Sequence, residues 1–193
     1  MVCALFHGYR KFQRMIRRAV LAAGLIAGSA ILYRAGIVWS ANFHTVAEGQ
    51  FYRSAQLNKD EFISAIDTYG IKSILNLRGA NPHSTWYIDE LAVARKRGVM
   101  HCDINVSAQQ PLTEAQVAAI LEIVRRAPKP ILVHCKSGAD RTGLVSALYC
   151  YAVRGKGAAE AEAELSVRYG HFPYLSSKTA AMDVTFQRYR RTH

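Results

Sequence analysis

The residues best suited to chemistry lie in one short stretch, HCKSGADRTG, at positions 134–143. Cys135 supplies a thiol that becomes a strong nucleophile once it is ionised. Arg141, six residues later, carries a planar guanidinium that can bind two oxygens of one oxyanion. Gly138 allows the backbone to turn between these two side chains. The stretch therefore predicts a nucleophilic site that binds phosphate or a similar tetrahedral anion.

The flanking residues predict elements that would place these groups together. Residues 130–134 (PILVH) are almost continuously apolar, which indicates a buried strand, and a helix is expected over residues 142–153. A strand–loop–helix unit directs unpaired backbone N–H groups at one point, and the helix dipole adds positive potential there. This environment favours the thiolate of Cys135 over the thiol. Thr142 can donate its hydroxyl to the sulfur and so ease its departure in a second step.

Strands and helices alternate along the rest of residues 42–193. The strands expected are 43–46, 50–54, 71–77 and 99–106, and the helices expected are 59–69, 84–97, 113–126, 158–169 and 176–190. Such alternation predicts an α/β domain whose sheet is covered by helices on both faces.

The charge of the chain is concentrated at its N-terminus. The net charge is +11, from 25 Lys and Arg against 14 Asp and Glu, and residues 1–41 hold six of the bases and none of the acids. The remainder is mildly basic, which suits an anionic substrate. No nucleic-acid-binding motif is present, so we expect no nucleic-acid partner.

The segment after the first basic cluster predicts a membrane helix. Residues 19–33 lack charge, but they reach only about 22 Å as a helix. Extension to residue 40 gives about 33 Å, enough for a bilayer if Arg34 reaches a headgroup. We expect a basic cytoplasmic tail over 1–18 and a signal anchor over 19–40, with a signal peptide cleaved near residues 28–30 and a buried core helix as alternatives.

The positive flank also predicts the orientation of the chain. Basic residues stay in the cytoplasm, so residues 42–193 should lie across the membrane. In a bacterium this topology corresponds to a single-pass inner-membrane protein with a periplasmic domain, or to a periplasmic protein after cleavage.

The stretch at 134–143 resembles the phosphate-binding loop of the cysteine-dependent protein tyrosine phosphatase superfamily, in which His-Cys, five residues, Arg and Thr or Ser follow one another. The FYRSAQ stretch at 51–56 resembles the start of small bacterial dual-specificity-like phosphatases, some of which are periplasmic. The resemblance covers about residues 42–170. It implies a protein tyrosine phosphatase-like α/β fold with a central sheet of four or five largely parallel strands, and a catalytic domain over 42–193.

The resemblance also implies a mechanism and a set of site residues. Members of this superfamily form a phosphocysteine intermediate and need no metal or other cofactor. Cys135 would be the nucleophile and Arg141 the phosphate clamp. The loop residues implied to bind the substrate are Lys136, Ser137, Gly138, Ala139, Asp140, Arg141 and Thr142.

The proton donor for the leaving oxygen is open. The loop at 107–111 (SAQQP), where the family usually places an Asp, has no carboxylate. Asp140 is our first candidate, because it resembles the acid proposed for myotubularin-like lipid phosphatases; its structural alternative is a tether of the loop. Asp103 has the family's spacing of 32 residues before Cys135 but falls inside a predicted strand. Glu114, or no acid at all, are the other possibilities.

Other polar and sulfur residues are predicted to have supporting roles. His134 should orient the loop, and Lys136 can add charge for a polyanionic substrate. Arg53 and Arg78 lie near strand ends, where they can assist binding or form ordinary surface ion pairs. The remaining cysteines of the domain, Cys102 and Cys150, are expected to be packing residues.

The sequence thus predicts a phosphatase that acts on phosphotyrosine and also on phosphoserine and phosphothreonine. The alternative substrate is a membrane lipid phosphate, such as a phosphoinositide or phosphatidylglycerophosphate. The missing loop carboxylate is the support for a second class, a pseudophosphatase that binds phosphate without turnover. The expected partners are therefore a phosphorylated protein or lipid, and the membrane through the N-terminal helix.

Overall fold

The computed structural model of the protein describes residues 2–193, without the side chains of residues 2–12 and Arg14. The chain forms two compact units, Met1–Trp39 and Ser40–His193. The first unit is the helix α1 (Val2–Trp39). The basic tail predicted over 1–18 falls mostly on side chains outside this description, as does Cys3.

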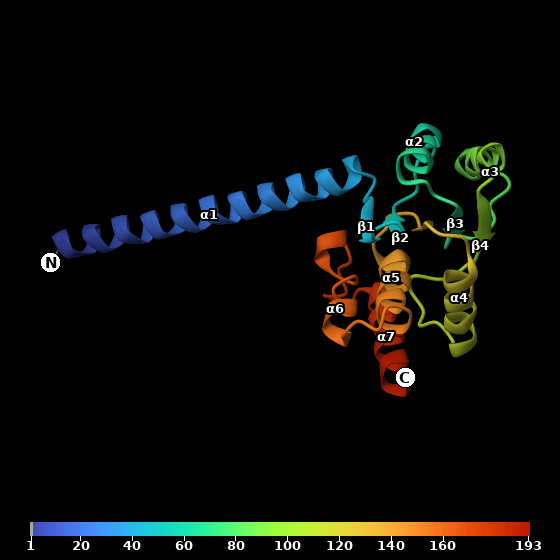
Figure 1. The fold of residues 1–193 in the computed structure, drawn as a ribbon. Coiled ribbons are helices and arrows are strands. Elements are labelled where there is room, and N and C mark those ends of the chain that lie inside the picture. The colour runs from blue at the N-terminus through green and yellow to red at the C-terminus, as the bar shows by residue number, and fades with distance from the viewer. Residues whose placement is uncertain (1) are drawn as a thin grey trace. The chain divides into compact units, whose positions relative to one another are not determined.

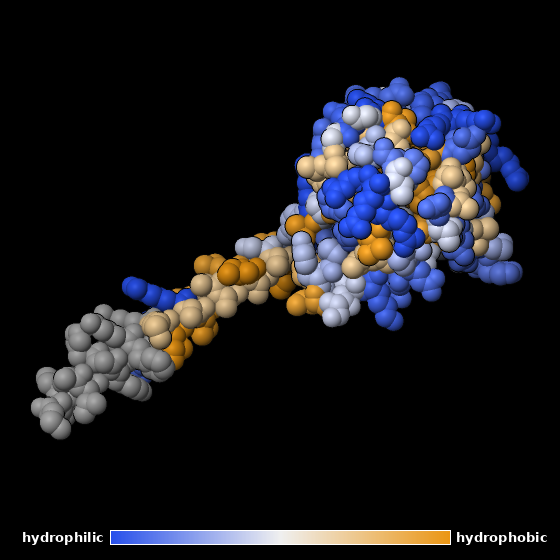
Figure 2. Space-filling view, turned by 90° about the horizontal axis from the view of Figure 1, so that it is seen from below, coloured by the Kyte–Doolittle hydropathy of each residue, from blue (hydrophilic) through white to orange (hydrophobic). Residues whose placement is uncertain are grey.

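Helix α1 contains a segment of 25 residues, Met15–Trp39, that is long and apolar enough to cross a membrane or to act as a signal sequence. Its length of about 37 Å exceeds the hydrocarbon core of a bilayer. None of its side chains is buried in the protein, and the described part presents apolar atoms all along its length (Figure 2). The predicted apolar helix is therefore present.

The second unit is built on a sheet of five strands in the order β1-β2-β5-β3-β4 (Figure 1). The strands are β1 (His44–Ala47), β2 (Phe51–Ser54), β3 (Ser73–Asn76), β4 (Met100–Asp103) and β5 (Ile131–His134). Only the β1–β2 hairpin is antiparallel, and the other three pairings are parallel. This confirms the predicted largely parallel sheet.

Helices cover both faces of the sheet, as predicted (Figure 1). They are α2 (Lys59–Tyr69), α3 (Thr85–Arg97), α4 (Glu114–Arg126), α5 (Asp140–Ala152), α6 (Ala158–Glu162) and α7 (Ala181–Thr192), with 3₁₀ turns η1 (Val167–Tyr169) and η2 (Lys178–Ala180). Successive strand residues point to opposite faces. In β5, Leu132 belongs to the core under α2 and α3, whereas Ile131 and Val133 belong to the core with α4, α5 and α7.

Local signals set most helix ends where the sequence predicts them. Asn58 and Thr113 form capping boxes at the starts of α2 and α4, because each side chain accepts from the N3 backbone N–H. Gly70 and Gly98 end α2 and α3 in the left-handed conformation.

The helix predicted over 158–169 is wrong in extent. Helix α6 stops at Glu162, and only the short turn η1 follows. The physical reason is tertiary, because Glu164 and Tyr169 are held by side chains from the start of the domain instead of by a continuous helix. These contacts form part of the site described next.

Candidate active site

The residues predicted to do chemistry lie at the centre of the sheet's carboxyl edge. Strand β5 lies between β2 and β3, and the loop of residues 135–139 leads from its end directly into α5. We call residues 134–143 the signature loop. Cys135 is buried, with 1% of its surface exposed. Ligands of open parallel sheets bind at this edge, where neighbouring strands end and helices begin.

Three successive carbonyls of the signature loop, those of residues 136–138, are each bound by a residue that precedes α2. The backbone N–H of Gln56 donates to the Lys136 carbonyl at 3.3 Å, Asn42 Nδ2 to that of Ser137 at 2.9 Å, and Arg53 Nη2 to that of Gly138 at 2.8 Å. In a planar trans peptide the N–H points opposite to the carbonyl. The N–H groups of residues 137–139 therefore face the other side of the loop.

Those N–H groups have no partner within the protein. Among the residues that the structure describes, no hydrogen bond uses an N–H of residues 136–141 as its donor. The N–H groups at the start of α5 belong to this set because a helix leaves its first donors unpaired. A curved row of free amides at a helix N-terminus is a binding site for an anion.

Gly138 is required for this path of the backbone. Its φ is +70°, and a Cβ at this position would lie 2.6 Å from the Ala55 nitrogen and 2.8 Å from the Ser54 carbonyl oxygen. These atoms belong to backbone that follows β2 and cannot move independently. Any other residue would thus separate the signature loop from the strand that supports it.

Arg141 is half-buried and is fixed through one of its nitrogens. Its Nη1 donates to the Leu77 carbonyl at 3.1 Å and to the Val106 carbonyl at 3.4 Å. Its Nε is buried and, in the described part of the chain, unpartnered. The side chain of Thr142, next along α5, is fully buried, and its hydroxyl likewise makes no hydrogen bond to a described group, Cys135 included. The loop thus offers further buried donors for an oxyanion.

Arg53 binds the signature loop and does not lie on the surface. Of the two roles that the sequence left open for it, assistance in binding and an ordinary surface ion pair, the surface ion pair is wrong. Its side chain is fully buried, and its guanidinium lies 3.8 Å from the centre of the Tyr169 ring. Besides Gly138, it binds the backbone carbonyl of Glu164 at 2.9 Å and the Glu164 carboxylate at 2.6 Å. Sequence reasoning missed this role, although the fully buried strand β2 that carries Arg53 was predicted.

A buried carboxylate holds the residue before the nucleophile. Glu90, on α3, accepts hydrogen bonds from His134 at 3.0 Å, from His101 at 2.7 Å and from Gln56 at 2.8 Å. Burial alone would raise the pKa of Glu90, but these bonds lower it to about 2. Glu90 is therefore ionised and orients the His134 ring, a function that no signal in the sequence indicated.

Two of the carboxylates predicted as proton donors are held by other side chains. Asp140 accepts from His171 at 2.7 Å. Asp103, the last residue of β4, accepts from Asn76 at 2.8 Å and from Tyr87 at 2.5 Å. Neither carboxylate has a described hydrogen bond with Cys135.

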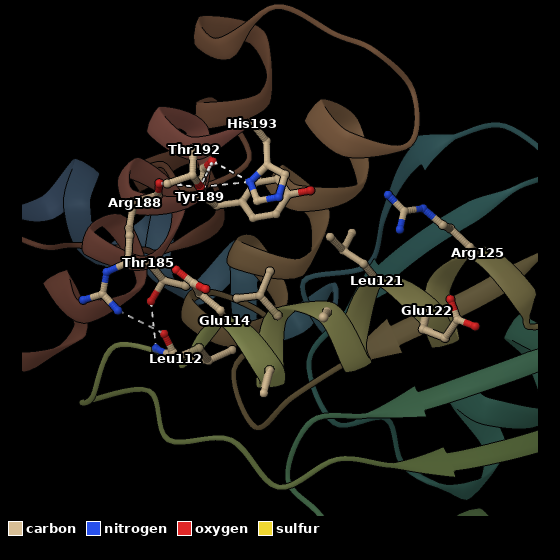
Figure 3. A pocket seen from close by; sticks show the side chains of 13 residues that line it. Leu112, Glu114, Leu121, Glu122, Arg125, Thr185, Arg188, Tyr189, Thr192 and His193 are labelled. Carbon is tan, nitrogen blue, oxygen red and sulfur yellow. Dashed lines mark hydrogen bonds between the residues drawn. The ribbon is translucent and has the colours of Figure 1, made fainter.

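Glu114 begins α4 and lines a groove of about 590 Å³ between α4 and α7, together with Leu112 and Arg188 (Figure 3). No residue of the signature loop lines this groove. The structure therefore places Glu114 in a setting separate from Cys135.

The domain has two further cysteines, Cys102 and Cys150. Burial raises the pKa of Cys102, and it raises that of Cys150 to about 11. Both pack against the core that contains α5. Among the described residues, no group of three or more His, Cys, Asp or Glu side chains could hold a metal ion.

Comparison with known families gives a match over most of the chain. A family model described as "DSP-PTPase phosphatase fused to NAD+ Kinase" matches residues 39–183. Two proteins from strains of Xylella fastidiosa, called beta-lactamase hydrolase-like proteins, are 37% identical over 87 residues, which is 44% of this chain and 20% of theirs. The chain thus spans about a fifth of the length of these curated relatives.

Solved structures share the fold of the second unit. TpbA from P. aeruginosa has a TM-score of 0.61 at 22% identity, over 79% of this chain and 91% of that one. A variant of TpbA in complex with pTyr gives 0.59 at 21%, over 77% and 90%. The core catalytic domain of the PP-IP phosphatase SIW14 from S. cerevisiae gives 0.58 at 23%, over 78% and 91%.

Proposed function

The chain belongs to the DSP-PTPase phosphatase family, and we propose that it hydrolyses phosphomonoesters through a phosphocysteine intermediate on Cys135. The observation that carries this proposal is the signature loop, whose carbonyls are bound on one side while its amides are free on the other. The cradle suits a phosphate group, and Arg141 adds a charged fork beside it.

The reaction has two displacements at phosphorus. In the first, the Cys135 thiolate attacks, an S–P bond forms, and the bond to the leaving oxygen breaks; that oxygen departs with the bonding electron pair and takes its proton from water. In the second, water attacks, the S–P bond breaks, and inorganic phosphate leaves with the thiolate restored. The amides of residues 136–141 and the Arg141 guanidinium hold the three non-bridging oxygens throughout.

Phosphotyrosine is the substrate that this site suits best. A phenolic oxygen leaves more readily than an alkyl oxygen, so its departure depends less on a proton donor. Asp103 and Asp140 are bound by other side chains, and Glu114 lines a groove that no residue of the signature loop lines, so a phenolic leaving group is favoured for this reason. The solved complex of a TpbA variant with pTyr has the same fold. Phosphoserine and phosphothreonine are expected as slower substrates.

A membrane lipid phosphate is the second candidate, and two cations favour it. The Arg78 guanidinium stacks 3.6 Å from the centre of the Trp86 ring and donates to Gln56 at 2.9 Å. The backbone N–H of Gln56 in turn donates to the backbone carbonyl of Lys136, and Lys136 is exposed. Neither Arg78 nor Lys136 forms an ion pair with a described residue. Such cations can bind further phosphate groups of a headgroup.

Initial rates on four substrates test the proposed function and its alternative. We expect the full-length protein to hydrolyse a tyrosine phosphopeptide at least about tenfold faster than a serine phosphopeptide, because of the leaving group. Phosphatidylglycerophosphate and a phosphoinositide in micelles complete the panel. A faster rate on either lipid than on the phosphopeptides would show that the substrate is a lipid phosphate. If none of the four substrates is hydrolysed, the proposed phosphatase activity is wrong.

For the topology we propose a cytoplasmic tail over residues 1–18, an anchor over 19–40 and a periplasmic catalytic domain over 42–193. The apolar segment Met15–Trp39 and the basic residues before it support this arrangement. We expect a reporter that works only in the periplasm to be active when fused after His193 in a bacterial host. Activity only of a cytoplasmic reporter at that position would contradict the orientation.

A further inference from the structure

A buried histidine joins the signature loop to the last helix. His171 is fully buried; its Nδ1 lies 2.7 Å from Asp140 Oδ1, and its Nε2 lies 2.9 Å from Asp183 Oδ2. An ionised carboxylate can only accept a hydrogen bond, so both ring nitrogens must carry protons to make both bonds. Burial alone would lower the pKa of His171, but the two carboxylates raise it to about 9. At neutral pH the ring is therefore an imidazolium between two carboxylates.

The segment that carries this imidazolium supports the signature loop at three points. Glu164 binds Arg53, which binds Gly138. Asn42 Nδ2 donates both to the Tyr169 carbonyl and to the Ser137 carbonyl, each at 2.9 Å. His171 binds Asp140, the first residue of α5. These three attachments follow the loop from its middle to the helix that it enters.

The position of Asp140 explains why its carboxylate needs a partner other than Arg141. Asp140 directly precedes Arg141, and only its Oδ1 has a described hydrogen bond. A free carboxylate one residue from the guanidinium would compete with the substrate phosphate for it. Through its bond to His171, the same carboxylate is directed to a buried cation, and it lies in the first turn of α5, where a negative charge is favourable.

We propose that His171 is a positioning residue for the phosphatase reaction, which fixes the Asp140 carboxylate and so sets the first turn of α5, with Arg141 and the amides, in the geometry that binds phosphate. The inference rests on the proposed function and extends it. It gives Asp140 a tethering role in place of the proton-donor role that we first expected from the sequence.

The two roles of Asp140 predict different dependence on the leaving group. Loss of a proton donor slows the hydrolysis of esters whose leaving group is a weakly acidic alcohol or phenol. It slows much less the hydrolysis of esters whose leaving group departs without protonation. Loss of a positioning contact slows both kinds of ester equally, because it impairs binding of the phosphoryl group that they share. A matched pair of aryl phosphates separates the two cases.

The test compares kcat/KM on phenyl phosphate and on 2,4-dinitrophenyl phosphate. We expect Asp140→Asn and His171→Gln each to lower both values by the same factor, about 10- to 100-fold, the size associated with misplaced catalytic groups. The double variant should be no worse than the worse single variant, because both changes break one contact. His193→Gln, an exposed histidine at the C-terminus, is the matched control and should be unchanged.

Three outcomes overturn the inference: a loss in Asp140→Asn confined to phenyl phosphate, full activity in His171→Gln, or multiplicative losses in the double variant. Asp183→Asn keeps the contact between His171 and Asp140 and serves as a second variant in case His171→Gln does not fold. It should lower kcat/KM on both esters by the same factor, and this factor should be smaller than that of His171→Gln. Tungstate affinity is read in parallel. If the wild type binds tungstate but hydrolyses neither ester, the proposed function fails. Even then, a tenfold weaker tungstate affinity in His171→Gln supports the positioning role of His171. An unchanged affinity refutes that role.

Discussion

Replacement of Cys135 by serine should abolish turnover of p-nitrophenyl phosphate, while the variant should still bind tungstate with nearly the affinity of the wild type. A hydroxyl at this position is a far weaker nucleophile than a thiolate, because it stays protonated at neutral pH. We expect kcat to fall on the order of 10⁴-fold or more, as when a nucleophile is removed from other covalent enzymes. The amides and Arg141 that hold the anion do not depend on the sulfur.

Cys102→Ser is the matched control for this substitution. Cys102 is the partly exposed cysteine of β4, where burial raises the pKa of the thiol, and it packs against the core. The control should therefore keep its activity within a few-fold. Turnover by Cys135→Ser within tenfold of the wild type would contradict the nucleophile assignment, and it would direct attention to a water-based or hydroxyl-based mechanism.

The fold could be predicted because its determinants are local. Asn58 and Thr113 start helices through contacts with residues two or three positions away. Strand β5 is apolar at nearly every position because helices cover both of its faces. The stretch at 134–143 also has its candidate chemistry in contiguous residues, so the residue types and their spacing were enough to predict a loop between a buried strand and a helix that carries a thiol and a guanidinium.

The supports of that loop could not be predicted, because their partners are far away in the sequence. Arg53 binds groups 85 and 111 residues away, and Glu90 binds His134 at a separation of 44 residues. His171 is 31 residues from Asp140. Each of these side chains has an ordinary surface role in most contexts. Only the packing of the sheet and helices brings them to the loop, and no periodicity encodes which side chain they meet.

The proton donor shows the same limit. Asp103 was a candidate because of its spacing from Cys135, and Asp140 because it resembles the acid proposed for myotubularin-like lipid phosphatases. The structure binds Asp103 to Tyr87 and Asp140 to His171, and both bonds are tertiary. A residue's type and position along the chain therefore predict that it lies near the site, but they do not predict which partner holds its side chain there.

Replacement of Arg141 by lysine should weaken both catalysis and anion binding. The guanidinium uses one nitrogen, Nη1, to bind two carbonyls. One is that of Leu77, directly after β3, and the other is that of Val106, in the loop after β4. Its other nitrogens remain for the phosphate. A lysine ammonium has a single nitrogen, which can bind the carbonyls or the phosphate but cannot reproduce the fork. We expect kcat/KM on p-nitrophenyl phosphate to fall on the order of 10³-fold, the effect of losing an oxyanion donor.

Arg126→Lys is the control, because Arg126 lies on the exposed face of α4 and pairs with Glu122 one turn away. It should keep the activity of the wild type, since exposed pairs of this kind contribute little. Tungstate affinity separates the two principal variants: Arg141→Lys should lose it by at least about tenfold, whereas Cys135→Ser should keep it. If both variants bound tungstate as tightly as the wild type, the amides alone would hold the anion. Arg141 would then act only on the charge that develops during transfer, and its loss would lower kcat without raising KM.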